Sequence, residues 1–362
     1  MSAASESRRV ISQGSVAKAV LGVKVPRAGA EDLRTRLTAL RLVDKSKSIL
    51  EDGDMILIPL LGAPRSAALE EFRATVVDFE FPDRKSPKVD PIILIRKAAR
   101  IPEELKQTLP DKWELLGDVV IIRLGDEFVP YLREVGEAYG YVLKSKAVLR
   151  EVGAIEGEFR EPKMSLIFGT DTETMHVENH VRFRLDAART MFSSGNEEER
   201  IRMATIRCDG ETVIDMFAGI GYFSIPLAVY QNPSKVIACE INPVAYRYLE
   251  ENIALNKVEG KVLPVLGDNR GLQGESIADR IVMGYVKTTH EFLSAAVRLI
   301  KSGGIVHYHE TCPNDLLPAR PIQRLQESVK NGTVEIMRHK EIKSYAPGVS
   351  HVVVDARIIK PS

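Results

Sequence analysis

Residues 213–230 read V-I-D-M-F-A-G-I-G-Y-F-S-I-P-L-A-V-Y. The segment opens with apolar, β-branched residues typical of a strand and closes with a run typical of a helix. Between them lies the spacing Asp215-x-x-x-Gly219-x-Gly221, whose glycines allow a sharp turn and a close approach of the backbone to a ligand. A strand that passes into a helix through such a turn predicts an α/β sheet that holds a nucleotide-like ligand.

The chain after this segment alternates short strand and helix patterns. Two late strands, Val334–His339 and His351–Ile359, are joined by a link too short for a helical crossover, so they should pair antiparallel. This order predicts the seven-stranded sheet of a Rossmann-like, class I methyltransferase fold. The predicted parallel strands are Val213–Phe217, Val236–Glu240, Lys261–Leu266, Arg280–Gly284 and Ile305–Glu310.

The chain before this sheet predicts two smaller units. We interpret residues 1–84 as a small α/β unit and 85–190 as an α+β middle domain, which leaves 191–362 for the sheet domain. In the middle domain Thr174–Leu185 is interpreted as one strand run. Asn196 is well placed as the N-cap of the charged helix that follows it.

The composition is that of a globular protein with two or three domains. Of 362 residues, 44% are hydrophobic and 28% are charged, and the formal net charge is zero. The three cysteines, Cys208, Cys239 and Cys312, form no C-x-x-C pair, which disfavours a disulfide framework or a structural zinc site. Without an apolar run of eighteen residues or a signal peptide, we expect a cytoplasmic protein with no membrane partner.

The N-terminal segment carries an excess of positive charge. Residues 1–50 hold ten Lys/Arg against four Asp/Glu. This excess indicates either a surface for a polyanion such as RNA or a solvated face, and the charge count does not separate them. The basic residues that would form such a surface are Lys24, Arg27, Arg34, Arg36, Arg41, Lys45 and Lys47.

Polar residues at three strand ends indicate which ligand the sheet holds. Glu240 ends the second strand, nineteen residues after Gly221, where a carboxylate accepts hydrogen bonds from ribose hydroxyls. Asp268 and Asn269 follow the third strand and suit the polar edge of an adenine. Asp215 puts a carboxylate into the first turn, which suits a ligand with an amino group and not one with a diphosphate. Together these positions predict S-adenosylmethionine.

Two other interpretations of the glycine turn fit less well. A dinucleotide would meet Ser224 in place of the third glycine of Gly-x-Gly-x-x-Gly, and the bulky Tyr222 and Phe223 where its diphosphate approaches. A sheet whose glycines only make tight turns would need three strand ends to imitate ligand chemistry by coincidence.

The fourth strand ends in Gly284-Tyr285-Val286, where enzymes of this architecture place groups at the reacting centre. Methyltransferases that modify an amide-like nitrogen often have Asn-Pro-Pro-aromatic or Asn-Leu-Pro there, whose oxygen atoms accept the hydrogens of the target nitrogen. This chain has neither motif. It therefore combines a methyltransferase sheet with an acceptor loop that is not that of a nitrogen methyltransferase.

From about Gly22 onward the chain resembles the Trm5/TYW2 family of tRNA-modifying enzymes. Two differences set it apart from the guanosine-37 methyltransferases of the Trm5 branch: Gly195 in F-S-S-G-N replaces an arginine, and G-Y-V replaces Asn-Leu-Pro. Both point to the archaeal wybutosine-synthesis branch, TYW2 or Taw2. His180 departs from both branches, because a glycine commonly follows Glu-Asn. The motifs that carry the resemblance are Val25-Pro26, Leu42-Val43-Asp44, Leu116-Gly117-Asp118, Glu178-Asn179, Met191–Asn196 with Glu199-Arg200, D-M-F-A-G-I-G-Y-F-S-I-P, E-I-N-P, G-D-N-R, M-G-Y-V and H-Y-H-E-T.

The resemblance implies a transferase that moves the 3-amino-3-carboxypropyl group of S-adenosylmethionine and not its methyl group. The implied acceptor is ring carbon C7 of 4-demethylwyosine at position 37 of tRNA-Phe, and the other product is 5′-methylthioadenosine. We expect a monomer that uses no metal, with residues 1–84 serving tRNA recognition. Two alternatives stay open: a tRNA guanosine-37 N1-methyltransferase, and a noncatalytic tRNA-binding protein that retains the cofactor fold.

The resemblance and the strand ends together give a set of candidate site residues. Ser193, Asn196 and Tyr285 are expected to orient the cofactor so that its methionine chain faces the RNA. Glu199-Arg200 forms either a surface pair or a brace for the Phe192–Asn196 loop, and the resemblance favours the brace. No base for the ring-carbon proton is evident. The residues expected to bind the cofactor are Ser193, Arg200, Asp215, Phe217, Gly219, Gly221, Glu240, Ile241, Asp268 and Asn269.

Two histidines lie close together on the fifth predicted strand. His307 and His309 are two residues apart and so share one face, with Glu310 beside them. A metal site would need a further ligand at suitable spacing, which the sequence does not offer. Structural hydrogen bonds, or a place in the wall of the base pocket, are the preferred interpretations.

Overall fold

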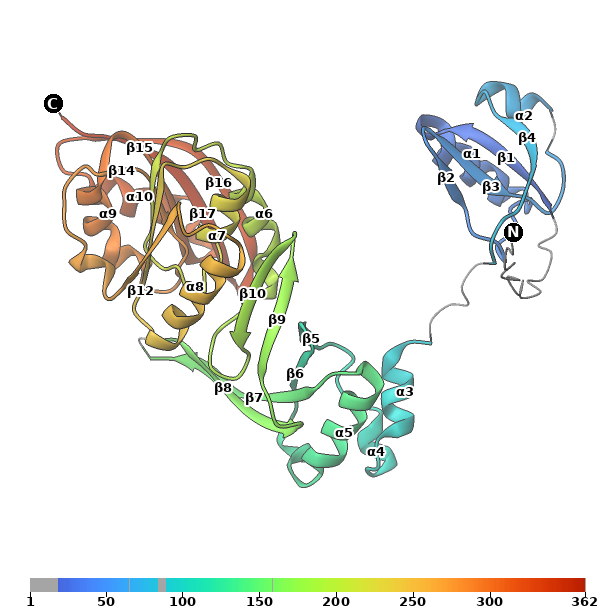
Figure 1. Cartoon of the computed structure of the whole chain (residues 1–362), viewed down its shortest axis with the longest axis horizontal. Coiled ribbons are helices and arrows are strands. Elements are labelled where there is room, and N and C mark those ends of the chain that lie inside the picture. Colours follow the sequence, from blue (N-terminus) through green and yellow to red (C-terminus); the bar gives the residue numbers. More distant parts are fainter. Residues whose placement is uncertain (1–18, 65, 84–88, 158, 362) are drawn as a thin grey trace, which may run out of the picture. The chain divides into compact units, whose positions relative to one another are not determined.

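The computed structural model describes residues 19–64, 66–83, 89–157 and 159–361. Its chain divides into two compact units, residues 1–89 and 90–362, drawn together in Figure 1. The predicted middle and sheet domains fall together in the second unit, and their division at residue 190 stays a prediction. Within the described residues, no helix is both long and apolar enough to cross a membrane.

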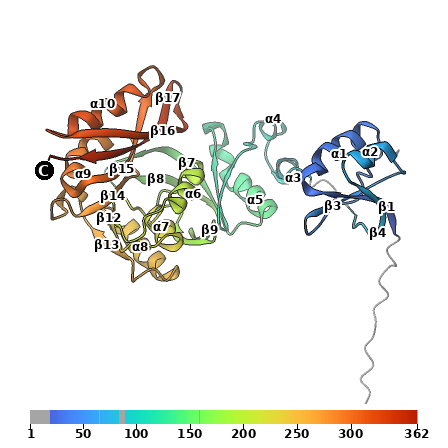
Figure 2. The same cartoon turned by 90° about the horizontal axis from the view of Figure 1, so that it is seen from above.

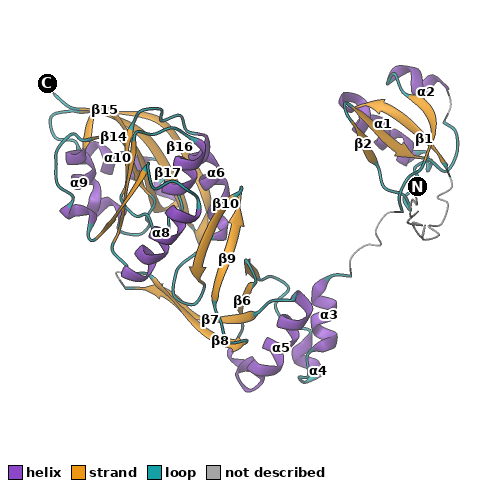
Figure 3. Ribbon diagram, viewed as in Figure 1, coloured by secondary structure: helices purple, strands orange, loops and turns teal. Residues whose placement is uncertain are grey.

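The first unit is a four-stranded antiparallel sheet in the order β2-β3-β1-β4, with α1 packed against it (Figure 3). Leu33 and Leu37 of α1 are fully buried and pack against Val23, Val25 and Ile58 of the sheet. This unit therefore contains both strands and helices, as predicted for residues 1–84. The elements are β1 (Val20–Pro26), α1 (Arg27–Ala39), β2 (Leu50–Asp52), β3 (Met55–Pro59), α2 (Ser66–Glu71) and β4 (Thr75–Phe79).

Most of the basic residues of this unit have acidic partners. Of the seven named above, five form ion pairs, which lowers the local excess of charge. The charge count alone therefore overstates this unit as a surface for RNA. The pairs are Lys24–Asp52, Arg27–Glu51, Arg34–Glu31, Arg36–Glu71 and Lys47–Asp83.

The second unit begins with two short helices, α3 and α4, followed by a four-stranded sheet in the order β5-β6-β7-β8. The chain passes from β6 to the parallel strand β7 through α5, and Val135 and Tyr139 of α5 are buried against Val120 of β6 and Val148 of β7. Trp113 packs edge-on against Tyr139 in the same core. The elements are α3 (Pro91–Ala98), α4 (Glu103–Lys106), β5 (Glu114–Leu116), β6 (Val119–Arg123), η1 (Asp126–Tyr131), α5 (Leu132–Leu143), β7 (Ala147–Glu156) and β8 (Glu161–Phe168).

A hairpin follows, and here the prediction of one strand over residues 174–185 is wrong. The segment forms two strands, β9 (Glu173–Glu178) and β10 (Val181–Asp186), paired antiparallel. Asn179 and His180 make the turn with φ of 46° and 60°. Two consecutive left-handed residues are typical of a two-residue hairpin turn, for which Asn-Gly is the usual signal. His180 takes the glycine's place, so that signal is missing.

The remaining strands form one seven-stranded sheet in the order β13-β12-β11-β14-β15-β17-β16. The first five are parallel and β17 is antiparallel to both of its neighbours, which confirms the predicted Rossmann-like methyltransferase fold. Strands β16 and β17 lie together in Figure 2. The elements are α6 (Glu197–Thr205), β11 (Thr212–Asp215), α7 (Ser224–Tyr230), β12 (Lys235–Glu240), α8 (Pro243–Leu255), β13 (Val262–Leu266), β14 (Ala278–Met283), α9 (Leu293–Leu299), β15 (Ile300–Pro313), α10 (Ala319–Ser328), β16 (Thr333–Ala346) and β17 (Val349–Ile359).

Helices bury the two faces of this sheet separately, because successive strand residues point to opposite faces. Val213 of β11 belongs to a core with α6, α7, α8 and the β10 strand of the hairpin. Ile214, the next residue, belongs to a second core with α9 and α10. Asn252 of α8 ties the hairpin to the glycine turn, since its amide bonds the backbone of Arg184 and the carbonyl of Ile220.

Candidate functional site

A cavity of about 470 Å³ lies at the carboxyl ends of β11, β12, β13 and β14, and we call it the strand-end cavity. Ligands of parallel α/β sheets bind at this edge, and the volume falls in the usual range for small-molecule sites. The predicted site residues that line it are Phe217, Gly219, Glu240, Ile241, Asp268, Asn269 and Tyr285. Among the described residues, the predicted site residues that do not line this cavity are Ser193, Asn196, Arg200, Asp215 and Gly221.

Asp215 and Gly221 shape the turn from beneath. The buried Asp215 carboxylate accepts hydrogen bonds from Ser224 Oγ (2.6 Å) and from the Phe217 amide (3.2 Å). Burial raises its pKa to about 6. Gly221 has φ of 104°, and a Cβ there would lie 2.4 Å from Ile225. Both residues therefore hold the turn in place and do not face the cavity.

Glu240 faces the cavity and also braces the turn. Its Oε2 accepts the Gly219 amide at 2.7 Å and its Oε1 accepts the Asn242 amide at 2.8 Å. Burial raises the pKa of this carboxyl. Each carboxylate oxygen has a second lone pair, so Glu240 still has the capacity to accept from a ligand's hydroxyls.

Asp268 and Asn269 differ in what they offer a ligand. Asp268 accepts from the Arg270 guanidinium, and this hydrogen bond lowers its pKa. The Asn269 amide nitrogen donates to Met216 O at 2.7 Å, while its buried Oδ1 has no partner among the described residues. An unsatisfied buried oxygen is costly, so this position favours a ligand that brings an N–H donor.

Aromatic rings close one side of the strand-end cavity. Phe217 and Tyr285 stack with ring centroids 4.8 Å apart, and Phe292 meets Phe217 edge-on at 4.9 Å. The Arg160 guanidinium lies 5.0 Å from the Tyr285 ring centroid. Phe217 and Tyr285 follow the ends of β11 and β14, so this apolar wall belongs to the same edge of the sheet and suits a flat base flanked by a polar sugar.

A second cavity of about 470 Å³ adjoins the first and is rich in basic side chains, so we call it the basic cavity. Arg160, Thr190, Met191 and Gly284 line both cavities. The basic cavity also holds the predicted Ser193 and Asn196. Its charged residues are five cations, Arg123, Arg160, Lys163, Lys287 and Lys343, and two carboxylates, Glu114 and Glu151.

Arg200 holds the Phe192–Asn196 loop on the wall of the basic cavity. The guanidinium is only 3% exposed, makes two 2.6 Å bonds to Glu178 of β9, and donates to Ser193 O at 2.7 Å. Burial acts to raise the pKa of Glu178, but the bonds from Arg200 and His176 outweigh it and bring the pKa to about 2. The brace interpretation of Arg200 is confirmed, whereas no contact with the strand-end cavity supports cofactor binding by this residue.

The loop presents Ser193 and Asn196 to the basic cavity. Lys343 of β16 donates to Ser193 Oγ at 2.8 Å, and burial lowers the pKa of Lys343. A Cβ on Gly195 would lie 3.0 Å from Lys343 Nζ, so the missing side chain leaves room for this lysine. Asn196 occupies the N-cap position of α6 without a capping bond, and its Oδ1 is buried and unpartnered among the described residues. The predicted N-cap position of Asn196 is confirmed, although its side chain makes no capping bond.

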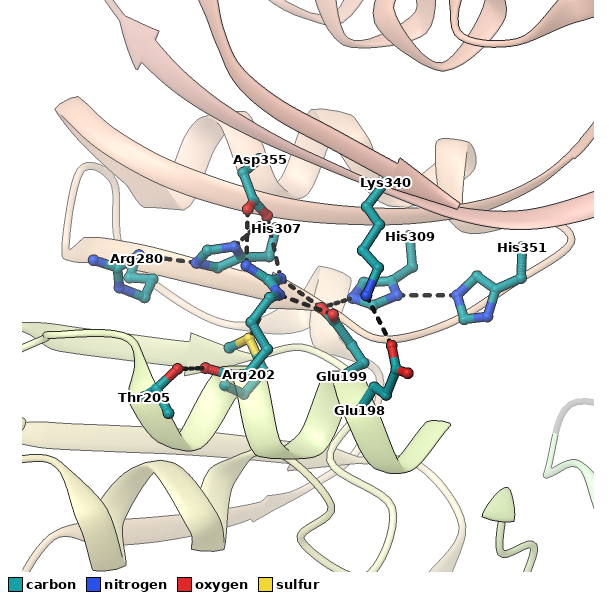
Figure 4. A network of polar contacts seen from close by, with 11 residues as sticks. Glu198, Glu199, Arg202, Thr205, Arg280, His307, His309, Lys340, His351 and Asp355 are labelled. Carbon is teal, nitrogen blue, oxygen red and sulfur yellow. Dashed lines mark hydrogen bonds and ion pairs between the residues drawn. The ribbon is translucent and has the colours of Figure 1, made fainter. Parts of the chain in front are cut away.

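Behind the basic cavity, a buried polar network joins α6 to β14, β15 and β17 (Figure 4). Arg202 donates to Asp355 at 2.8 Å and also pairs with Glu199. His307 bridges Asp355 (Nδ1, 2.6 Å) and Arg280 (Nε2, 2.9 Å). Arginine only donates, so His307 Nε2 accepts and His307 Nδ1–H donates to the carboxylate. His307 is thus a structural residue, as one of the two preferred interpretations held.

Several site residues were not predicted from the sequence. Arg160, Thr190 and Met191 separate the two cavities, while Lys343 and His351 come from the last two strands. They come from separate parts of the chain, and among them only Met191 belongs to a motif named above. Within the described residues, no group of three or more His, Cys, Asp or Glu side chains is arranged to hold a metal.

The sheet order and a nucleoside-sized cavity at its carboxyl edge define a transferase of the Rossmann-like methyltransferase fold. The chain belongs to the TRM5/TYW2 family. The TRM5/TYW2 methyltransferase domain matches residues 174–337 and the TYW2 N-terminal domain matches residues 95–172. The tRNA methyltransferase 5 N-terminal domain matches residues 22–68.

Three relatives place the chain within this family. A tRNA(Phe) (4-demethylwyosine(37)-C(7)) aminocarboxypropyltransferase of Pyrococcus horikoshii is 47% identical over 262 residues, 72% of this chain and 94% of the relative. The structure of Methanocaldococcus jannaschii TYW2 in complex with AdoMet is 40% identical, with a TM-score of 0.57 over 69% of this chain and all of that one. Pyrococcus abyssi Trm5b is 36% identical, with a TM-score of 0.68 over 94% of this chain and 99% of that one.

Proposed function

We propose that the protein transfers the 3-amino-3-carboxypropyl group of S-adenosylmethionine to C7 of 4-demethylwyosine at position 37 of tRNA-Phe. The observation that carries the proposal is the junction of the two cavities at Gly284. One cavity offers nucleoside-binding groups and the other offers cations, and the strand end between them lacks the asparagine that a nitrogen methyltransferase uses. The similarity to aminocarboxypropyltransferases at 47% identity supports the same reaction.

The strand-end cavity fits S-adenosylmethionine. Asn269 Oδ1 lacks a donor, which the exocyclic amine of an adenine provides, and Glu240 retains lone pairs for ribose hydroxyls. The Phe217–Tyr285 stack gives the adenine an apolar surface. When bound, S-adenosylmethionine supplies the 3-amino-3-carboxypropyl group and leaves as 5′-methylthioadenosine.

The basic cavity fits the modified nucleotide of a tRNA. Lys287 and Lys343 supply positive charge for the phosphate backbone, which dominates protein–nucleic acid affinity. Ser193 and Asn196 lie on its wall, and Gly284 adds no side chain between the cavities. The chain's own task is to place the acceptor ring carbon in line with the carbon to be transferred, since positioning alone contributes several kcal/mol to such a step, roughly 7–11 at best.

Two separately labelled samples of S-adenosylmethionine test the reaction. The protein is incubated with tRNA-Phe carrying 4-demethylwyosine and cofactor labelled either in the methyl or in the carboxyl carbon. We expect carboxyl label in the tRNA and methyl label in 5′-methylthioadenosine. Methyl label in the tRNA, with carboxyl label left in solution, would replace the proposal by N1-methylation.

The methyltransferase alternative is tested in the same assay because one observation favours it. The similarity to Trm5b extends over 94% of this chain, including the region matched by the tRNA methyltransferase 5 N-terminal domain. An unmodified tRNA with guanosine at position 37 is therefore the matched second substrate. We further propose a cytoplasmic monomer, which cell fractionation and sedimentation equilibrium test.

A further inference from the structure

The proposed reaction replaces a hydrogen on a ring carbon with a carbon chain, so a proton must leave. None of the residues assigned so far takes it. A group that does so must reach the basic cavity, hold an unprotonated lone pair there, and have its orientation fixed by neighbours.

His351 meets these requirements. It lies near the start of β17, lines the basic cavity, and is only 3% exposed. Its Nε2 lies 3.0 Å from Nδ1 of His309 on β15. Figure 4 marks this contact with a dashed line. The other ring nitrogen, Nδ1, makes no hydrogen bond to any residue that the structure describes. One nitrogen is therefore held by the protein while the other is left for a ligand.

His309 leads from His351 to a buried carboxylate. Its Nε2 lies 3.5 Å from Glu199 Oε1, longer than a normal hydrogen bond, and has no hydrogen-bond partner among the described residues. His309 and Glu199 are each 1% exposed, and Glu199 is fixed by Arg202 (Nε to Oε2, 2.8 Å). The chain of contacts thus runs from α6 through β15 to β17 and ends at the cavity wall.

This arrangement fixes both tautomers. A lone pair on His309 Nε2 would face a carboxylate oxygen, so the proton belongs on Nε2 and the lone pair on Nδ1. His309 Nδ1 then accepts from His351 Nε2–H. A neutral imidazole carries one proton, so the lone pair of His351 must lie on Nδ1. Burial, His309, Lys343 and Arg160 lower the pKa of His351 to about 3, which keeps the ring neutral at physiological pH.

Resting on the proposed function, we infer that His351 Nδ1 is the general base that removes the proton from the acceptor ring carbon, with His309 and Glu199 as positioning residues. The carbon–carbon bond forms as the carbon–sulfur bond of S-adenosylmethionine breaks, and the sulfur keeps that electron pair. The C–H electron pair restores the ring's conjugation, and the proton goes to His351 Nδ1. It later leaves to water through the cavity.

The pair also lies close to the junction of the cavities. Phe223 lies between His309 and Gly284, the residue at the junction. A Cβ on Gly284 would be 2.4 Å from the Phe223 ring, and the centroid of this ring is 5.7 Å from that of His309. One aromatic ring therefore separates the histidine pair from the strand end at which the two cavities meet. Lys343 is the competing base, because it faces the same cavity and its pKa is lowered by burial.

Single-turnover transfer of the carboxyl-labelled group to tRNA with hydrogen or deuterium at C7 separates the two bases. His351→Gln keeps a donor toward His309 but has no basic lone pair. We expect its rate to fall by about 10²–10⁴-fold and a primary deuterium isotope effect to emerge, because proton removal becomes rate-limiting. Lys343→Met at saturating tRNA should show no such isotope effect. Thermal unfolding and S-adenosylmethionine binding close to wild type confirm that each variant is folded.

Two further variants keep the test decisive. His351→Ala should recover part of its rate with added imidazole, which repairs a missing base but not a disturbed fold. His309→Asn keeps an acceptor near the Nδ1 position and should lose less activity than His309→Leu. Wild-type rates in His351→Gln, or an isotope effect in Lys343→Met instead, would overturn the assignment. A wild-type protein that transfers no carboxyl label would refute the proposed function itself.

Discussion

The strand-end cavity and the basic cavity adjoin, yet they are built differently. The first is formed largely by turns that follow neighbouring strands and is braced by backbone hydrogen bonds, such as Gly219 N–H to Glu240. The second is assembled from β5–β8, the loop before α6, and β16 and β17, and it depends on long-range ion pairs such as Arg200–Glu178. One cavity thus follows from local chain geometry and the other from tertiary contacts, which predicts different responses to mutation.

The largest expected effect is on the support of the basic cavity. Glu178→Ala leaves the Arg200 guanidinium, 3% exposed, without its carboxylate. Breaking a buried ion pair from one side costs about 3–5 kcal/mol of unfolding free energy, measured by urea denaturation. Glu335→Ala removes an exposed pair with Arg357 and should cost about 1 kcal/mol or less. Equal losses in the two variants would contradict a special role for the brace.

The buried carboxyl groups that support the two cavities should change the stability of the fold with pH in opposite directions. Glu178 has a folded pKa of about 2 against 4.5 for the free residue, so its stabilisation is present above pH 4.5 and lost as pH falls toward 2. The shift corresponds to roughly 3 kcal/mol. Asp215 has a folded pKa of about 6 against 3.8, so its contribution is present at low pH and lost as pH rises from 3.8 to 6.

Urea denaturation between pH 2 and 8 measures both terms as differences from matched variants. Glu178→Gln should remove the loss of stability below pH 4.5, and Asp215→Asn should flatten the region between pH 3.8 and 6. If the stability difference between Asp215→Asn and wild type does not change over that interval, the buried Asp215 carboxyl does not titrate as the structure indicates.

A change at Glu240 should affect ligand binding in the strand-end cavity and spare the basic cavity. Glu240→Ala removes hydrogen bonds to a charged acceptor, worth about 1.5–3 kcal/mol, so S-adenosylmethionine should bind roughly 10–100-fold more weakly by calorimetry. Affinity for tRNA should be unchanged. Glu250→Ala, an exposed change on α8, is the control. Unaltered cofactor binding in Glu240→Ala would remove this residue from the site.

The smallest expected effect concerns one cation of the basic cavity. Lys343→Met should weaken tRNA binding several-fold and reduce the slope of log affinity against log salt by about one, because one phosphate contact is lost. Binding of S-adenosylmethionine should stay at the wild-type value. Lys340→Met removes an exposed lysine of the same strand, paired with Glu198, and serves as the control. A similar salt slope in both variants and the wild type would argue against a phosphate contact at Lys343.

Sequence reasoning found the strand-end residues because chemistry and secondary structure coincide there. Glu240 ends one predicted strand and Asn269 follows the next within three residues, and parallel strands bring their carboxyl ends to one edge. The roles of Asp215 and Arg200 were less accessible. Each belongs to a motif of the site, but the bond from Ser224 to Asp215 beneath the turn and the pair of Arg200 with Glu178 form only in the folded chain.

The basic cavity could not be predicted in the same way. The sequence places Lys343 in the link between two predicted strands and His351 at the start of the second strand. Their importance comes from the longer strand β16, in which Lys343 pairs with His351 of β17, and from the hydrogen bond of Lys343 to Ser193 in the loop before α6. The hairpin that carries Glu178 was also not predicted. Its turn needs a left-handed residue, which is usually a glycine, but this chain has His180 there. Long-range contacts leave no local periodicity to read.

The chain order of the lining residues has a consequence for biosynthesis. Every residue that lines the strand-end cavity has been made once the ribosome passes Phe292, whereas the basic cavity waits for Lys343 and His351. Domains generally fold in order from the N-terminus during synthesis, which proceeds at roughly 5–20 residues per second. The acceptor side is therefore completed seconds after the last residue of the nucleoside side, so a nascent chain cannot modify RNA before its final strands are in place.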